Sequence, residues 1–480
     1  MAVVAISIIV IPITPEAHGA AKPFPIYWRR ISPIVAVTVP YPPETSKDLD
    51  SALEGARLNY ETRRPMSLAA HNSASQFMPG GNTRTVLYHG PFPLRIVSGD
   101  GCRLMDADGI SYVNFLGEYT AGLFGHSNPE IRAAIIDALD HGVSLSGHNE
   151  NEIRLAELVC TRFPSIDLVR FTNSGTEANL MAISAARCFT GKSKVMVFNG
   201  GYHGGLLYFK NGGVPVNAPY EYVLGPYNSV AEAGELIRAN HQDLACVLVE
   251  PMQGSAGCIP ASREFLQALR NACDETGTVL IFDEVMTSRL DSGGAQSLLG
   301  VIPDMTTLGK YIGGGMSFGA FGGREEIMAL FDPGRVDGLP HAGTFNNNSI
   351  TMSAGVAAMG TVLTADALAG LNSRGDALRE KLNSLALENN ARLCFTGAGS
   401  LIGMHGLASL PTRVEDCQGG EDRIVELLFL DLLEKGYYMA RRGFISLMLP
   451  LDDSDLAGFV DAFQSILEER KTVISRDSLD

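Results

Sequence analysis

Positively charged residues are scarce in this sequence. Its 480 residues include 37 Lys and Arg against 53 Asp and Glu, which gives a formal net charge of -16 at pH 7. Nucleic acids and anionic membranes are bound through clustered positive charge. The composition therefore argues against both as main partners. It leaves room for a small anionic ligand, which needs only a local positive pocket.

Paired cysteine motifs are also missing. The eight cysteines form no C-x-x-C pair and show no spacing typical of zinc ligands. Most of them lie among apolar neighbours, as small buried hydrophobic residues do. We therefore expect no metal site. We also expect the protein to be located in a reducing compartment, the cytoplasm.

The first 50 residues lack the basic region that begins a secretory signal. Residues 1–14 are apolar, but Pro12 and Pro15 interrupt the stretch, and it is too short to span a bilayer. Prolines continue to about residue 50. We expect residues 1–50 to form a poorly ordered N-terminal extension outside the fold.

Apolar strands alternate with helical segments in the middle of the chain. The expected strands are residues 168–171, 194–198, 244–249 and 279–282, and the expected helices between them are residues 177–189, 230–239 and 263–276. This alternation predicts an α/β fold with a mostly parallel sheet and helices on both faces. Ligands of such sheets bind at the carboxyl ends of the strands.

The pattern changes on both sides of this region. Short strands with Asp-Gly turn signals are expected within residues 94–115, and helices within 54–70, 129–139 and 151–163. Beyond residue 350, long helices flank short strands near residues 395, 401 and 445. We expect residues 51–115 and 351–480 to form a smaller α/β domain, and residues 116–350 to form the large domain.

Lys310 stands after a short apolar run and just before three consecutive glycines, residues 313–315. A lysine held there could form a Schiff base with a bound carbonyl compound. Asp283 ends an apolar strand, where its carboxylate could hold a pyridine nitrogen. Pyridoxal phosphate chemistry needs this pair of groups. A surface lysine and a capping aspartate are the alternatives. A dinucleotide site is poorly supported, because the glycines do not open a helix after a first strand.

Two further turns carry candidate ligand contacts. Residues 173–176, Asn-Ser-Gly-Thr, close a strand and open a helix, where free N–H groups and hydroxyls suit a phosphate. Tyr202 lies in a glycine-rich turn after another strand and could stack on a flat ring. An ordinary helix cap and a packed loop aromatic are the alternative interpretations.

The order of these motifs resembles the class III (omega) aminotransferases of the fold type I pyridoxal-phosphate superfamily. The similarity covers about residues 78–451, and the glutamate-1-semialdehyde aminomutases have a similar overall pattern. The resemblance implies a large domain with a mostly parallel seven-stranded sheet and a smaller domain from the N- and C-terminal segments. The motifs that carry it are F-T-N-S-G-T-E-A (171–178), G-G-Y-H-G (200–204), V-E-P-M-Q-G (249–254), F-D-E-V (282–285), T-L-G-K-Y-I-G-G-G (307–315) and A-G-T-F (342–345).

The resemblance also implies roles for individual residues. Lys310 would be the Schiff-base lysine and the acid–base group, and Asp283 would hold the pyridine nitrogen. Val285 and Tyr202 would lie on opposite faces of the ring. Members of this family are homodimers with shared active sites. The phosphate would be bound by Ser174, Gly175 and Thr176, with Thr344 completing the site of the neighbouring subunit.

Four motifs are similar to those of β-amino-acid (β-phenylalanine) aminotransferases: P-G-G-N-T-R-T-V-L (79–87), G-E-Y-T-A-G (117–122), G-H-N-E (147–150) and R-R-G-F (441–444). An arginine in the first and last motifs is tied to the substrate carboxylate in those enzymes. The matching residues are Arg84 and Arg442, although the adjacent Arg441 leaves open which of the pair points inward. An arginine suits this task because its planar fork grips a carboxylate bidentately.

The sequence thus predicts a dimeric pyridoxal-phosphate-dependent aminotransferase. It would move an amino group from an amino acid to a keto acid such as 2-oxoglutarate or pyruvate. The best match for the amino acid is a β-amino acid, aromatic or not. One alternative is a 2,1-aminomutase, which needs no external acceptor. Another is a catalytically inactive homologue with a binding role, which the presence of Lys310 and Asp283 disfavours.

Overall fold

The computed structural model describes residues 48–476, all of which belong to the same structural unit. The expected N-terminal extension lies outside the described residues except for its last three. Of these, Leu49 begins helix α1, and the carboxylate of Asp48 caps it by accepting from Ser51 N. The division at residues 51–115, 116–350 and 351–480 stays a prediction.

A seven-stranded sheet lies at the centre of one part of the chain, in the strand order β4-β12-β11-β10-β7-β5-β6. All neighbours pair in parallel except β12, which is antiparallel to both β11 and β4. The prediction of a mostly parallel sheet of this size is confirmed. The strands are β4 (Leu168–Thr172), β5 (Lys194–Phe198), β6 (Tyr222–Gly225), β7 (Leu244–Val249), β10 (Val279–Asp283), β11 (Met305–Gly309) and β12 (Gly319–Gly323).

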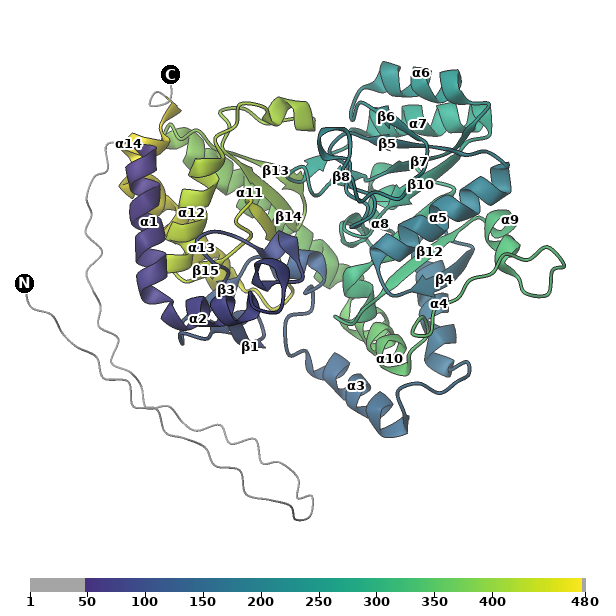
Figure 1. Cartoon of the computed structure of the whole chain (residues 1–480), viewed down its shortest axis with the longest axis horizontal. Coiled ribbons are helices and arrows are strands. Elements are labelled where there is room, and N and C mark those ends of the chain that lie inside the picture. The colour runs from purple at the N-terminus through teal and green to yellow at the C-terminus, as the bar shows by residue number, and fades with distance from the viewer. Residues whose placement is uncertain (1–47, 477–480) are drawn as a thin grey trace, which may run out of the picture. The chain divides into compact units, whose positions relative to one another are not determined.

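Both faces of this sheet are covered by helices, as Figure 1 shows. Alternate residues of β7 explain why. Cys246 and Leu248 pack with α5 (Gly175–Thr190), whereas Val247 and Val249 pack with α6 (Val230–Asn240) and α7 (Arg263–Thr276). Every residue of β7 is therefore buried, which accounts for its uninterrupted apolar sequence.

Strand β12 is not evident from the sequence, because Gly-Ala-Phe-Gly-Gly has little strand propensity. Its glycines are required because the backbone of neighbouring segments lies too close to leave room for side chains. A Cβ on Gly319 would lie 2.1 Å from the carbonyl oxygen of Ser174, and one on Gly323 would lie 2.5 Å from that of Asp304. The strand thus brings the turn after β4 close to the end of β11.

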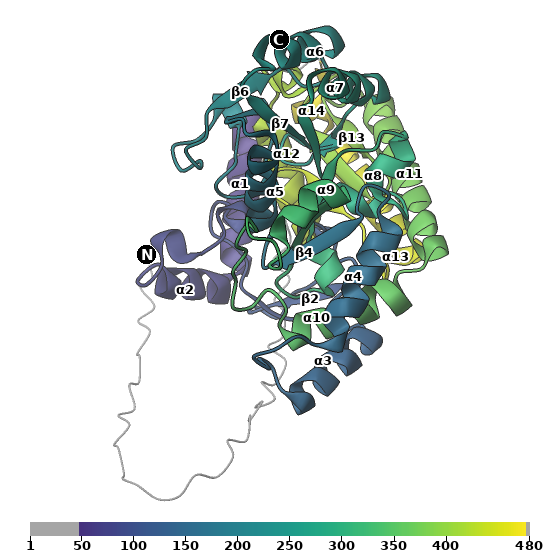
Figure 2. The same ribbon diagram turned by 90° about the vertical axis from the view of Figure 1, so that its right-hand side faces the viewer.

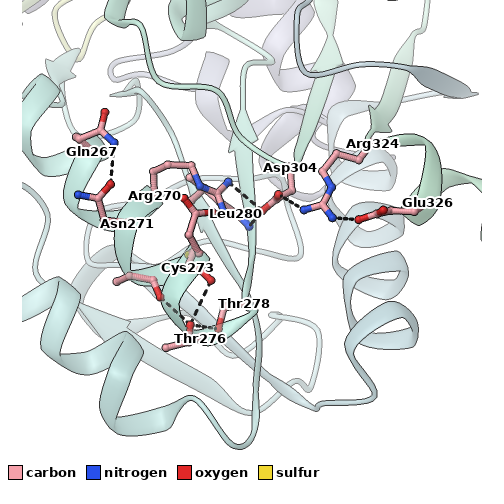
Figure 3. A network of polar contacts seen from close by, with 12 residues as sticks. Gln267, Arg270, Asn271, Cys273, Thr276, Thr278, Leu280, Asp304, Arg324 and Glu326 are labelled. Carbon is pink, nitrogen blue, oxygen red and sulfur yellow. Dashed lines mark hydrogen bonds and ion pairs between the residues drawn. The ribbon is translucent and has the colours of Figure 1, made fainter.

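The start of β11 is tied to its neighbours by the buried carboxylate of Asp304 (Figure 3). It accepts from Leu280 N at 2.7 Å, from Arg270 Nη1 at 3.0 Å and from Arg324 Nη1 at 2.7 Å. Arg324 also forms an ion pair with Glu326. This network fixes the amino ends of β10 and β11, and with them the direction in which their carboxyl ends point.

Smaller sheets combine segments from the two ends of the chain. One has the order β1-β2-β3-β15, in which β1 to β3 form antiparallel pairs and β15 runs parallel to β3. The antiparallel β13-β14-β16 sheet and the β8-β9 pair complete the set. These strands are β1 (Ile96–Asp100), β2 (Arg103–Asp106), β3 (Ser111–Asn114), β8 (Met252–Gln253), β9 (Ile259–Pro260), β13 (Cys394–Ala398), β14 (Leu401–His405), β15 (Tyr437–Tyr438) and β16 (Phe444–Ser446).

Helices from both ends also meet. Figure 1 shows α1, in purple, beside the yellow α12, and the two helices are in contact. In both views α3 lies next to α10, which in turn contacts α4 (Figure 2). The remaining helices are α1 (Leu49–Arg63), α2 (Pro65–Ala74), α3 (Pro129–His141), α4 (Glu150–Arg162), α8 (Gly294–Leu299), α9 (Glu325–Met328), α10 (Ser349–Ala357), α11 (Ala365–Glu388), α12 (Asp422–Glu434), α13 (Asp453–Glu469) and α14 (Lys471–Ile474).

Most expected elements are present, with shifted ends. The helix expected over residues 54–70 is two helices, because Pro65 starts a new one after Arg64. Elements that the sequence analysis did not expect include strands β6 and β11 and helix α13. Within residues 48–476, no single helix has both the length and the apolar character needed to cross a bilayer; only the bent pair formed by 349–362 and 365–388 passes that test.

Candidate active site

The candidate site lies at the carboxyl edge of the seven-stranded sheet. Asp283 ends β10, Glu250 follows β7, and Lys310 follows β11 as the first residue of a short 3₁₀ turn, Lys310–Gly313. The turns after β4 and β5 reach the same edge, because β4, β5, β7, β10 and β11 share one direction. The topology therefore brings together groups that are far apart in the sequence.

Lys310 has a backbone φ of 55°, a left-handed conformation that non-glycine residues seldom adopt. Its pKa is lowered to about 8 because burial disfavours the charged ammonium, while the carboxylates of Asp283 and Glu250 act in the opposite direction. Roughly one-tenth of a lysine with this pKa is a neutral amine at pH 7, which is far more than at the ordinary pKa of 10.5. A neutral amine is the form that attacks a carbonyl or accepts a proton.

Asp283 is 4% exposed and is held on both carboxylate oxygens. Oδ2 accepts from His203 Nδ1 at 2.8 Å and from Asn179 Nδ2 at 2.9 Å, and Oδ1 accepts from Val285 N at 3.0 Å. Asn179 is fixed in turn by the hydroxyl of Thr307, which donates to its Oδ1 at 2.7 Å. The position of this carboxylate is thus set by β11, α5 and the turn after β5.

Sequence reasoning assigned no role to His203, Asn179 or Glu250. Each carried a signal that could have been used. His203 follows Tyr202 in the turn after β5, Asn179 is an amide in an alanine-rich helix, and Glu250 directly follows the apolar strand β7. A buried polar residue beside a strand end needs a partner there.

Glu250 is a second buried carboxyl group at this edge. Its oxygens accept from Tyr202 N at 2.9 Å and from Gly254 N at 3.1 Å. Burial raises its pKa to about 7, and the charge of Asp283 acts in the same direction, while His203 opposes it. Glu250 therefore joins the turn that carries Tyr202 to the segment at residues 254–255.

The expected phosphate turn lies at the amino end of α5. Ser174 is the N-cap of this helix, and its hydroxyl accepts from Glu177 N at 3.2 Å. Thr176 Oγ1 accepts from Gly205 N at 3.3 Å. A Cβ on Gly204 would lie 2.1 Å from that hydroxyl oxygen, so the turns after β4 and β5 pack tightly together. The capping interpretation of Ser174 is correct, and free N–H groups of the first helical turn accompany it.

Val285 lies close to the residue before Lys310, and Tyr202 is bound through its N–H to Glu250 at the same edge of the sheet. A Cβ on Gly175 would lie 2.9 Å from Val285 Cγ2, and one on Gly309 would lie 3.2 Å from Val285 Cγ1. Val285 thus packs between the phosphate turn and the residue before Lys310. Tyr202 is 45% exposed, and its ring stands edge-on to Tyr208 with centroids 5.2 Å apart. A half-exposed aromatic side chain at this edge suits stacking on a flat ring.

The two candidate arginines reach the site from different segments. Arg442 Nη1 donates to the carbonyl oxygen of Ser255 at 2.9 Å, next to the segment bound by Glu250. Burial raises the pKa of Tyr202, and the charges of Arg442 and Arg84 act against this rise, so both arginines lie within electrostatic range of that phenol. Arg441 instead pairs with Glu426 on α12. Arg442 is therefore the member of the pair on the side of the site.

Thr344 is the expected site residue that stands apart. It is exposed, in a segment whose Asn346 Oδ1 accepts from Asn173 Nδ2 at 2.9 Å. The segment thus borders the phosphate turn, although the Thr344 side chain itself forms no hydrogen bond within residues 48–476. Its expected role toward a neighbouring subunit stays a prediction.

The sequence matches the family description "Aminotransferase class-III" over residues 87–209 and 214–467. This chain belongs to the class III aminotransferases. It is 48% identical to the β-phenylalanine transaminase of Variovorax paradoxus over 432 residues, which cover 90% of this chain and 99% of that protein. It is 44% identical to an uncharacterized aminotransferase of Schizosaccharomyces pombe, over 89% of this chain and 98% of that one.

Solved structures agree with this assignment. The crystal structure of the Variovorax paradoxus β-phenylalanine aminotransferase superposes with a TM-score of 0.88 and covers 89% of this chain and 99% of its own. An omega-transaminase from Sphaerobacter thermophilus, 37% identical, gives 0.80 over 84% and 98%. A glutamate-1-semialdehyde aminomutase from Pseudomonas aeruginosa also gives 0.80 over 88% and 98%, but its 23% identity supports the shared fold alone.

Proposed function

We propose that this aminotransferase uses pyridoxal 5′-phosphate to move an amino group from a β-amino acid, preferably an aromatic one, to a keto acid. The observation that carries the proposal is the pairing of Lys310, whose pKa is lowered to about 8, with the buried carboxylate of Asp283 at one sheet edge. The 48% identity to a β-phenylalanine transaminase, and Arg84 and Arg442 beside Tyr202, support the substrate class.

The residues at the sheet edge fit this cofactor. Asp283 carries a buried carboxylate on which His203 and Asn179 converge, suited to a protonated ring nitrogen. Ser174 caps the amino end of α5, where the N–H groups of the first helical turn suit a phosphate, and Gly175 and Gly204 let Val285 and Thr176 pack closely around this turn. Bound pyridoxal phosphate supplies an aldehyde that takes up the amino group and a ring that withdraws electrons.

Each residue then has a task that its environment supports. Lys310 Nζ takes the proton from the substrate carbon that bears the amino group, because its lowered pKa makes it a competent base near neutral pH. The carboxylate of Asp283 would hold the ring nitrogen. Ser174, Gly175 and Thr176 would bind the phosphate, and Val285 and Tyr202 would lie against the ring. Arg84 and Arg442 orient carboxylates.

We propose a homodimer in which Thr344 contributes to the phosphate site of the neighbouring subunit. The exposed segment at residues 342–345, and exposed apolar side chains on the adjoining elements such as Leu139, Leu145 and Phe345, support such an interface. The eight cysteines are all free, which suits the cytoplasm as a location.

An acceptor-dependence assay tests the proposed reaction. Purified enzyme is incubated with a panel of α- and β-amino acids, with and without 2-oxoglutarate or pyruvate. We expect β-phenylalanine and related β-amino acids to react only when an acceptor is present. Isomerised product without acceptor would establish the aminomutase alternative. Turnover of α-amino acids alone would contradict the β-amino-acid specificity.

Arginine variants test the substrate class. Arg84→Ala and Arg442→Ala should each weaken carboxylate substrates by about 1.5–3 kcal/mol, which is roughly 10- to 100-fold in kcat/KM. Simple amines should be affected far less. Arg441→Ala is the matched control, because Arg441 pairs with Glu426, and Arg57 keeps that carboxylate paired. If both variants keep full kcat/KM for β-amino acids and for 2-oxoglutarate, neither arginine binds substrate.

A further inference from the structure

The short segment Gly117–Thr120 has an unusual backbone beside the candidate site. Its residues have φ values of 52°, 50°, 50° and 82°, so Glu118, Tyr119 and Thr120 are three successive non-glycine residues in the left-handed region. Side chains are disfavoured there because Cβ comes too close to the backbone. Such strain persists only where surrounding structure fixes it, and it gathers at functional sites.

Contacts on both sides of the segment hold this conformation. Asn114, which is 2% exposed, accepts from Leu116 N at 2.9 Å and from Gly117 N at 3.1 Å through its Oδ1. A Cβ on Gly117 would lie 2.6 Å from the carbonyl oxygen of Ser446 in β16. The segment is thus clamped between the end of β3 and strand β16.

The two middle residues of the segment are bound to the chain around Arg84. Glu118 Oε1 forms an ion pair with Arg84 Nη1 at 2.5 Å, and Tyr119 Oη donates to the carbonyl oxygen of Val86 at 2.9 Å. The pair uses one nitrogen of the guanidinium. The remaining donors of Arg84 stay available to another carboxylate.

The ring of Tyr119 is bound to the other arginine. The guanidinium carbon of Arg442 lies 5.3 Å from the centroid of the Tyr119 ring and 5.5 Å from that of Phe444. The two rings stack on each other with centroids 5.3 Å apart and planes 29° apart. A guanidinium over an aromatic face is held in place without using its hydrogen-bond donors.

We propose that Gly117–Thr120 is a positioning segment that sets both carboxylate-binding arginines, with Glu118 acting on Arg84 and Tyr119 acting on Arg442. The inference rests on the proposed function, since it assigns to two further residues the orientation of the substrate contacts. It explains the strained backbone, because adjacent residues of one segment engage two arginines that come from opposite ends of the chain.

The test compares the variants of the segment with those of the arginines. KM and kcat are measured for the β-amino acid and for 2-oxoglutarate with Glu118→Gln, Tyr119→Leu, Arg84→Ala and Arg442→Ala. Glu118→Gln should raise KM about 2- to 5-fold for the same substrate that Arg84→Ala impairs, as expected for a half-exposed ion pair. Tyr119→Leu should do so for the substrate that Arg442→Ala impairs. In both cases the loss should fall on KM more than on kcat.

Two further measurements separate a positioning role from a structural one. The first is the affinity of the enzyme for 3-phenylpropionate, an unreactive carboxylate, measured by titrating the cofactor absorbance. This affinity should fall in the same variants whose KM for the β-amino acid rises. Tyr119→Phe retains the ring, so its KM for the substrate that Arg442→Ala impairs should stay close to the wild-type value. Glu118→Gly removes the strained side chain, so the melting temperature should stay the same or rise while carboxylate binding weakens.

The outcomes distinguish this proposal from the one on which it rests. If Arg84→Ala and Arg442→Ala leave all carboxylate KM values unchanged, the arginines bind no substrate, and both proposals fail. If the arginine variants have their expected effects but Glu118→Gln and Tyr119→Leu impair both substrates equally, or lower stability alone, the segment is merely structural, and only the positioning role is overturned.

Discussion

Asp283 and His203 form a buried pair at the carboxyl edge of the sheet, with Oδ2 of the aspartate 2.8 Å from Nδ1 of the histidine. Asn179 shares the same oxygen. An ionised carboxylate is acceptor-only, so Nδ1 of His203 carries the hydrogen in this pair. The pair fixes the orientation of the group that we assign to the ring nitrogen.

His203→Ala removes one of the two side-chain donors to Asp283 Oδ2. We expect kcat to fall by about 10-fold, in line with partners that orient a functional carboxylate, and the cofactor to dissociate faster on dialysis. Cofactor retention is measured by absorbance after gel filtration. His241→Ala, at the exposed end of α6, is the control. Unchanged retention and turnover would show that Asn179 alone suffices to hold Asp283.

Asp283→Asn should preserve the fold but lose most turnover. An amide cannot keep a ring nitrogen protonated, so the ring withdraws electrons poorly. It also places an NH₂ group opposite a neighbouring donor. Circular dichroism checks the fold, and single-turnover kinetics measure the chemical step. Near-wild-type rates would mean that another group serves the ring nitrogen.

Lys310→Ala should abolish transamination, because Nζ is both the attachment point and the base in the proposed reaction. Borohydride reduction of the wild-type enzyme, followed by peptide mapping, should label Lys310. Lys435→Ala, which removes a surface lysine paired with Glu469, should retain activity. A label on a lysine other than Lys310 would refute the assignment.

The strand ends of the site were predictable because each closes an apolar run. Asp283 and Lys310 were found in this way, and the turn with Ser174 by its hydroxyl and glycine pattern. The left-handed segment at Glu118 was not, because no residue type there demands a positive φ. The choice between Arg441 and Arg442 depends on Glu426 of α12, which only the folded chain brings near.

Strand β12 offers a prediction about stability. Gly319→Ala would place Cβ 2.1 Å from the carbonyl oxygen of Ser174, so the sheet or the phosphate turn must shift. We expect a loss of about 1–3 kcal/mol in the free energy of unfolding, seen as a lower melting temperature. Gly370→Ala is the matched control: no atom lies within 4 Å of its Cβ inside α11, so it should stabilise by roughly 0.5–1 kcal/mol. Equal melting temperatures for the two variants would refute the packing argument.

Glu250 should make stability depend on pH. Its pKa is raised from the ordinary value of 4.5 to about 7 in the folded chain because it is buried, so the folded state binds the proton more tightly. Its contribution is therefore fully present below about pH 4.5 and is lost as the pH rises through about 7. The full loss amounts to roughly 3 kcal/mol, because each pKa unit corresponds to about 1.36 kcal/mol. The Glu250→Gln variant has no ionisable group at this position. The contributions of all other titrating groups cancel in the difference in stability between the variant and the wild type. Between pH 5 and pH 8, the melting temperature of the cofactor-free variant should therefore rise relative to that of the cofactor-free wild type. A lost hydrogen bond to Tyr202 or Gly254 would add a cost that does not change with pH. A difference that stays constant across this range would show that Glu250 ionises normally in the fold.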